Sequence, residues 1–187
     1  MSTQIKSAIF SVHRNDVAWE DGKLEQTGSK DSFLLAGFDQ ETKTPIGMVS
    51  GLILPHKNLK GAIKKAAPGM EYIVEPLCNE DGSFNQPYCL WGTSVVVALA
   101  AEVHPAYEDA GGKECLLDAM PEVLSRYIPG IVGILTPALP WRTILPGETR
   151  TPEFWEESQR IAELCEQHGF QRLESDILLM YRPLMAV

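Results

Sequence analysis

Runs of apolar residues divide the chain into segments that predict β-strands. The longest run, TSVVVALAAEV at 93–103, contains small and β-branched residues, which is typical of a strand buried on both faces of a sheet. The two runs at 33–38 and 46–54 are separated by Gln-Glu-Thr-Lys-Thr-Pro, a polar sequence typical of a turn. Strands are expected at 33–38, 46–54, 71–77, 93–103, 130–135, 170–174 and 177–183.

Three other segments carry apolar residues at the spacing of a helix, namely 56–67, 113–128 and 151–168. Pro121 lies inside the second segment, where an interior proline costs about 3 kcal/mol, so we expect that helix to be kinked or split. The third segment begins with Thr151-Pro152-Glu153 and ends before Gly169, which are favoured start and stop signals. Residues 1–32 show little helical period.

The order of these elements predicts a mixed α/β protein built on one central sheet. The chain has 187 residues, a length that one domain can fold around a single core, so we expect one domain spanning 1–187.

Charge and cysteine usage narrow the classes of partner and compartment. The chain has 16 Lys and Arg against 25 Asp and Glu, a net charge of −9. This balance disfavours nucleic acid and anionic membranes and favours a basic small molecule, amine or peptide. No apolar run reaches about 18 residues, and the first residues do not have the pattern of a secretion signal. We therefore expect a cytoplasmic protein.

The four cysteines do not form a recognisable metal motif, because there is no Cys-x-x-Cys and no histidine at metal-binding spacing. We expect no metal site. Cys78 and Cys89 flank a turn-rich segment and could pair across a hairpin, whereas a reducing cytoplasm favours free thiols.

The segment VHPAYEDAGGKECLL follows the long apolar run and leads into a predicted helix. Unpaired N–H groups at a helix start attract anions. The same segment, however, carries Glu108, Asp109 and Glu114 against a single Lys113. It is therefore either an anion cradle or a plain connection between a strand and a helix.

Four segments occur along the chain in the order FLLAGFDQETKTPIGMVSG, VHPAYEDAGGKECLLDAM, AELCEQHGF and SDILLMYRPL. In these segments the sequence resembles the GNAT superfamily of N-acyltransferases. The resemblance extends over roughly residues 33–54 and 93–184. The first is similar to the family's early hairpin and the second to its acyl-CoA motif. The last two are similar to its final helix and closing strand.

The resemblance implies a mixed, mostly antiparallel central sheet with helices on both faces. It also implies transfer of an acetyl group from acetyl-CoA, as co-substrate, to an amine of a small molecule or peptide. Members of the family often pair through their terminal strands, so the resemblance also allows a homodimer. The residues that would bind the cofactor are Ala101 and Val103 along the pantetheine, and Ala110, Gly111, Gly112, Lys113, Glu114 and Cys115 around the pyrophosphate.

The sequence departs from the family pattern at Glu108 and Lys113, where the motif has Arg or Gln and a second glycine. Cys165 stands where many members have a tyrosine that protonates the leaving thiolate. Cys165 is thus a candidate catalytic acid, and its alternative role is inert packing. The candidate bases are Glu102 and His104, whose alternatives are a solvated strand end and a residue that caps a turn. Trp91, Trp141 and Trp155 either line a substrate pocket or pack in the core or in loops.

Three functional hypotheses remain after this reading. The first is an acyl-CoA-dependent N-acyltransferase, and the second is a catalytically inactive GNAT-like binding or interaction protein. The third is an unrelated α/β protein.

Overall fold

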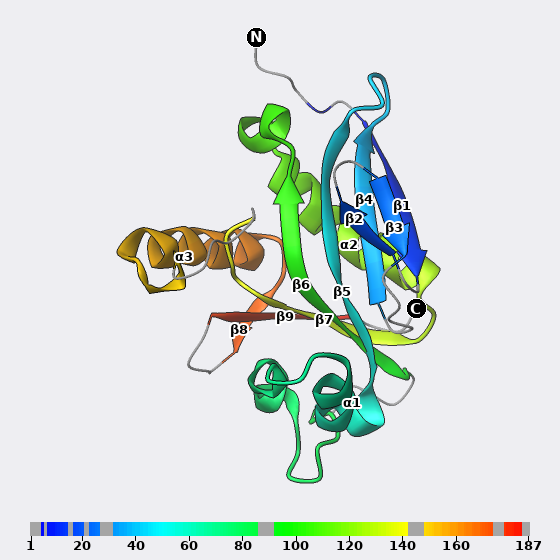
Figure 1. The fold of residues 1–187 in the computed structure, drawn as a ribbon, viewed down its shortest axis with the longest axis vertical. Helices are drawn as coiled ribbons and strands as arrows, with labels where there is room; N and C mark the ends of the chain where they lie inside the picture. Colours follow the sequence, from blue (N-terminus) through cyan, green and yellow to red (C-terminus); the bar gives the residue numbers. More distant parts are fainter. Residues whose placement is uncertain are drawn as a thin grey trace.

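The computed structural model describes residues 5, 7–14, 17–20, 23–26, 32–85, 92–141, 148–173 and 178–184. Its main feature is a seven-stranded sheet with the strand order β1-β4-β5-β6-β7-β9-β8 (Figure 1). These strands are β1 (Ala8–Arg14), β4 (Ser32–Asp39), β5 (Pro45–Pro55), β6 (Ser94–Val103), β7 (Ile131–Pro137), β8 (Gln171–Leu173) and β9 (Leu179–Pro183). A separate two-stranded sheet pairs β2 (Val17–Glu20) with β3 (Lys23–Gln26).

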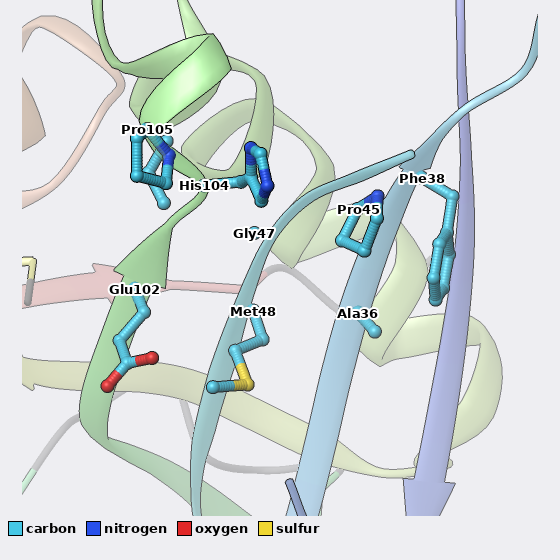
Figure 2. A pocket seen from close by; sticks show the side chains of 9 residues that line it. Ala36, Phe38, Pro45, Gly47, Met48, Glu102, His104 and Pro105 are labelled. Atoms are coloured by element: carbon cyan, nitrogen blue, oxygen red, sulfur yellow. The ribbon is translucent and has the colours of Figure 1, made fainter. Parts of the chain in front are cut away.

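Neighbouring strands of the main sheet run antiparallel except for β6 and β7, which are parallel. The register places Ala36, Met48 and Glu102 in one row across β4, β5 and β6, as Figure 2 shows. The parallel pair arises because a helix carries the chain back from the end of β6 to the start of β7. The predicted mixed, mostly antiparallel sheet is therefore confirmed.

In the described part of the chain, three α-helices cover the sheet, α1 (Leu59–Ala66), α2 (Gly112–Tyr127) and α3 (Pro152–Gln167). Apolar residues of α2 and α3 share one core, which includes Leu116, Met120 and Ile161. Leu59 and Ile63 of α1 belong to a second core. The two cores lie on opposite faces of the sheet, since alternate residues of β6 contribute to them. The expected helices on both faces are thus present.

The strand expected at 71–77 is wrong. The chain instead forms two 3-10 turns, η2 (Glu71–Ile73) and η3 (Glu75–Leu77). Pro76 lies in the second turn, and Ile73, Val74 and Leu77 are buried together at the spacing of a helical turn. Pattern and proline therefore both favour turns over an extended strand.

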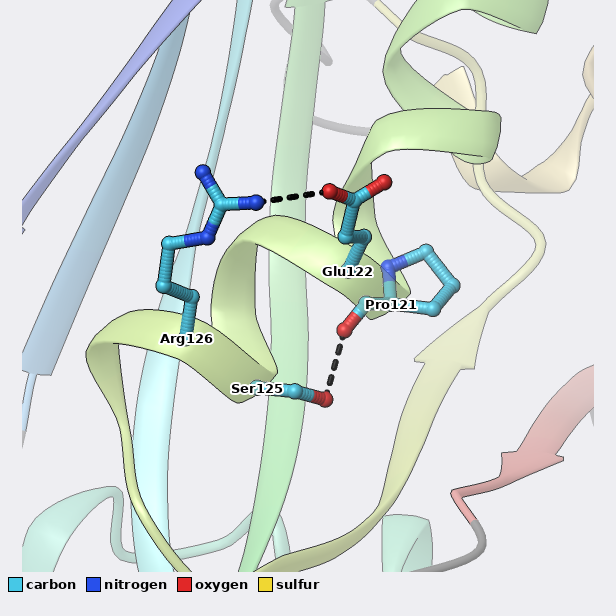
Figure 3. Close-up of polar contacts among 4 residues, drawn as sticks. All are labelled: Pro121, Glu122, Ser125 and Arg126. Atoms are coloured by element: carbon cyan, nitrogen blue, oxygen red, sulfur yellow. Dashed lines mark hydrogen bonds and ion pairs between the residues drawn. The ribbon is translucent and has the colours of Figure 1, made fainter. Parts of the chain in front are cut away.

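The helix expected to be kinked or split at Pro121 is one continuous element (Figure 3). Leu117 and Leu124 are fully buried on either side of the proline, so both halves are fixed to the sheet. Beside the proline, the Ser125 hydroxyl donates a hydrogen bond of 2.6 Å to the Pro121 carbonyl oxygen. Tertiary packing offsets the missing backbone hydrogen bond.

The N-terminal part supplies an edge strand that the sequence pattern did not predict. β1 pairs antiparallel with β4 along its full length, from Ala8 opposite Asp39 to Arg14 opposite Phe33.

The helices in the described part of the chain are too short or too polar to cross a membrane.

Candidate functional site

The parallel strands β6 and β7 stay paired for only a short distance. Their register runs from Ser94 opposite Ile131 to Val97 opposite Leu135. Beyond this point β6 continues along β5 as far as Val103, while β7 continues along β9 (Figure 1). Within the described strands, the second half of β6 therefore has no partner on its β7 side, and its backbone polar groups there are available to a ligand.

A β-bulge marks the place where β6 leaves β7. Ala98 pairs with Gly51 and Ala100 pairs with Ser50, so Leu99 is the extra residue on β6. A Cβ atom on Gly51 would lie 1.9 Å from the Val97 carbonyl oxygen, so the close approach of the two strands requires glycine here. A bulge bends its strand and increases the local twist, which accounts for the divergence.

The helix α2 begins just beyond the end of β6, after the 3-10 turn η4 (Pro105–Ala110). Gly111 joins the two with a φ of 82°, which is the left-handed region that favours glycine. A Cβ atom on Gly112 would lie 2.7 Å from Val103 Cγ1 and 2.8 Å from the Tyr107 carbonyl oxygen. Gly111 thus allows the chain to change direction, whereas Gly112 allows α2 to pack closely against Val103 and Tyr107.

The first turn of α2 supplies three N–H groups, those of Gly112, Lys113 and Glu114, that no intrahelical carbonyl can accept. The Cys115 N–H donates to the Gly111 carbonyl oxygen at 2.9 Å, so this member of the predicted cradle is already engaged. The space in front of Gly111 is open, because the nearest atom to a Cβ built there is Glu114 Oε2 at 3.9 Å. The backbone therefore fits an anionic group such as a pyrophosphate.

The side chains around this turn do not add to the attraction for an anion. Glu108, Asp109 and Glu114 are all exposed, and Lys113 is partly buried. Glu114 stands in the first turn of α2, where a carboxylate interacts favourably with the helix dipole and would compete with a bound anion. Backbone donors are the attractive part of this site.

Glu102 lies on β6 on the face of the sheet opposite α2, since its neighbours Ala101 and Val103 both belong to the core that contains α2. It is partly buried and lines a pocket of about 280 Å³ together with Met48, Phe38 and other residues (Figure 2). A carboxylate in such a pocket can accept a proton from an amine.

His104 caps the turn that follows β6. Its Nδ1 accepts a hydrogen bond from the Ala106 N–H at 3.2 Å, and its ring contacts the buried Tyr107 edge-on. One ring nitrogen of His104 is therefore engaged in capping the turn. Of the two candidate bases, the structure leaves Glu102 better placed.

Cys165 lies on α3 with only 1% of its surface exposed, among the apolar side chains of the core. Burial raises the pKa of its thiol to about 12, with a smaller contribution from the negative charge of Glu166. Both observations favour the packing role over the role of catalytic acid. The catalytic role stays a prediction.

One buried polar residue of α3 was not anticipated from the sequence. Ser158 is 1% exposed, and its Oγ has no hydrogen-bond partner among the described residues. The sequence feature that could have revealed it is the position of this serine in the buried stripe that also contains Phe154, Ile161 and Cys165. Trp155, one of the three tryptophans predicted to line a pocket or to pack, lines a cavity of about 340 Å³ together with Phe154 where β6 and β7 separate.

The other predicted residues divide between the core and undescribed parts of the chain. Trp141 is 7% exposed and packs in the core. Trp91 and Cys89 lie outside the described residues. Cys78, Cys115 and Cys165 are free thiols, and the described part of the chain contains no group of three or more His, Cys, Asp or Glu side chains that could hold a metal ion.

No protein-family model matches the sequence, and a search of curated proteins finds no match either. Among solved structures, NAA60 of Arabidopsis thaliana in complex with a bisubstrate analogue is 16% identical, with a TM-score of 0.44 over 82% of this chain and 76% of that chain. Nourseothricin acetyltransferase is 11% identical, with a TM-score of 0.40 over 92% and 86%.

A third structure, ribosomal-protein-S5-alanine acetyltransferase from Vibrio fischeri, is 10% identical, with a TM-score of 0.39 over 81% of this chain and 61% of that chain. At these identities and TM-scores, the matches do not identify an activity or a substrate.

Proposed function

We propose that this protein is an acyl-CoA-dependent N-acyltransferase that transfers an acetyl group from acetyl-CoA to a primary amine. The observation that carries the proposal is the divergence of β6 from β7 at the Leu99 bulge, next to the open N-terminus of α2. This combination offers unpaired strand backbone to an extended polar arm and N–H donors to a pyrophosphate.

In the proposed arrangement the pyrophosphate lies at the N–H groups of Gly112, Lys113 and Glu114. The pantetheine follows the free side of β6 near Ala101 and Val103, which points the thioester towards the bulge. These contacts use backbone atoms, so the acidic side chains of the turn weaken binding without removing its donors.

The reaction forms a bond between the amine nitrogen and the thioester carbonyl carbon, and the bond from that carbon to sulfur breaks. The nitrogen must lose a proton to become a neutral nucleophile and then an amide. Glu102 is assigned as the base that accepts it, because its carboxylate lines a pocket on the face of β6 opposite α2. The leaving thiolate can take a proton from water, so no buried acid is required.

Thermal unfolding with and without acetyl-CoA tests binding. A ligand at about 100 times its Kd stabilises the native state by about 2.7 kcal/mol, which should raise Tm by roughly 5–10 °C in a domain of this size. The matched control is S-acetyl-N-acetylcysteamine, which has the thioester but no pyrophosphate and should give no shift. Absence of a shift at millimolar acetyl-CoA would exclude the proposal.

The alternative is an inactive binding protein of the same fold, which would keep the backbone donors at the start of α2 without transferring an acyl group. Release of free CoA thiol in the presence of amines separates the two. A thermal shift without thiol release supports the alternative, whereas release that falls at least about tenfold in Glu102→Gln supports the enzyme.

A further inference from the structure

The cavity of about 340 Å³ lies between five segments that are far apart in sequence, one of which contributes only Leu178. Leu99 of the bulge and Ala138 beyond β7 contribute the walls where the strands separate, and Phe154 and Trp155 come from the first turn of α3. Tyr72 comes from the 3-10 turn that follows α1. The volume falls at the lower end of the range for small-molecule pockets.

The lining of this cavity is largely aromatic and apolar. Phe154 is 2% exposed, and its ring meets that of Trp155 at 90° with 5.5 Å between centroids. Trp155 and Tyr72 are 46% and 49% exposed, so both rings reach solvent. Two large rings held half-exposed beside an apolar cavity indicate a surface that binds another apolar group.

The cavity passes through the gap between β6 and β7 and is lined from both faces of the sheet, since Ala138 and Leu178 pack in the core that contains α2. Leu99 and Met70, which both line it, pack against the core that contains α1. The N–H donors proposed for the pyrophosphate belong to α2, which packs in the other core. An acyl donor held by these N–H groups would reach the gap from the α2 side, which leaves the side of Met70 and Tyr72, next to α1, for the other substrate.

Glu102 connects the cavity to the proposed chemistry. It lies on the same face of β6 as Leu99, because both point away from the core that contains α2. The two residues are three positions apart, a distance of at most about 10 Å along a strand. An amine whose nitrogen lies beside Glu102 can therefore reach Leu99 with the far edge of an aromatic ring that is held two or three bonds from the nitrogen. The net charge of −9 favours approach of such a cation.

We propose that this cavity binds a bulky apolar substituent of the acceptor, so that the acceptor is a small primary amine with a group the size of an aromatic ring near its nitrogen. This inference rests on the proposed function for the reaction, but the cavity can be tested by binding alone. Trp155 is then the residue that determines specificity at its rim.

The test compares 2-phenylethylamine with propylamine as acceptors for acetyl-CoA, in the wild type and in Trp155→Ala. The two amines differ in basicity, but this difference is the same for every protein. It therefore cancels when the ratio of their kcat/KM values is compared between the wild type and the variant. We expect the wild type to favour 2-phenylethylamine at least about tenfold, as apolar pockets do for larger groups, and Trp155→Ala to lose most of that preference. Tyr127→Ala is the matched control, because Tyr127 is 47% exposed on the far end of α2, and should keep it. An unchanged ratio in Trp155→Ala would overturn the inference.

A second arm separates the acceptor from the acyl donor. With propylamine as acceptor, the preference between acetyl-CoA and hexanoyl-CoA should be the same in the wild type and in Trp155→Ala. A change in this preference instead of the amine preference would assign the cavity to the acyl chain and overturn the inference.

A third arm measures binding of 2-phenylethylamine to the free protein by calorimetric titration. We expect binding at least about fivefold weaker in Trp155→Ala than in Tyr127→Ala. This result would support the cavity even if acetyl-CoA gives no thermal shift, so that failure of the proposed function and failure of the inference remain distinguishable. Equal binding by both variants would overturn the inference.

Discussion

Replacement of Cys165 by alanine separates a catalytic thiol from a packed one. The Cys165 thiol is 1% exposed, and burial raises its pKa to about 12. The thiol of CoA is expected to have an ordinary pKa of about 8.5. Proton transfer from Cys165 to a CoA thiolate would therefore run uphill by the difference between the two pKa values, which corresponds to roughly 5 kcal/mol.

We expect Cys165→Ala to leave kcat within about twofold of the wild type for that reason. It should lower the free energy of unfolding by about 1 kcal/mol, since the loss of one buried heavy atom leaves a small cavity. Release of CoA thiol measures the first quantity, and urea unfolding measures the second.

Cys78→Ala is the matched control, because Cys78 is a partly buried free thiol in a different part of the chain. A loss of kcat greater than about tenfold in Cys165→Ala, without the same loss in Cys78→Ala and without a change in the urea midpoint, would refute the packing role.

Three further outcomes are expected. Burial raises the pKa of Cys165 in the native state above its ordinary value of 9.0. The stability that the neutral thiol contributes is therefore complete below pH 9 and is lost as the pH rises towards 12. Urea unfolding at pH 8 and pH 10.5 should show a steeper loss in the wild type than in Cys165→Ala, by up to about 1.4 kcal/mol per pH unit. Gly112→Ala should lower stability by about 1–3 kcal/mol and abolish the acetyl-CoA thermal shift, because the new methyl group would force α2 away from β6; an undiminished shift would contradict the role of this glycine. Ser158→Ala should stabilise the free protein by about 1 kcal/mol, because it removes a buried hydroxyl that has no hydrogen-bond partner among the described residues, and a lower urea midpoint would show that the hydroxyl is satisfied in solution.

Much of the secondary structure could be predicted from the sequence because its signals are local. The run predicted as a strand at 93–103 corresponds to β6. The start and stop signals around 151–169 correspond to the bounds of α3, Pro152–Gln167. The prediction of a strand at 71–77 failed because the helical spacing of its buried residues and Pro76 were not recognised. The helix is not split at Pro121 because packing holds both halves. The sequence pattern could not weigh the burial of Leu117 and Leu124 against a missing hydrogen bond.

The sequence by itself determined that a glycine pair joins a strand to a helix, and it located the carboxylate and the thiol that could serve the chemistry. Only the tertiary structure decided what these residues can do. It set Glu102 in a pocket, buried Cys165, and gave Gly111 and Gly112 separate roles. The Leu99 bulge and the cavity beside it depend on the register between β5 and β6 and on contacts from four other segments. Register and cavity shape arise from pairs of residues that are distant in sequence, so no local pattern could contain them.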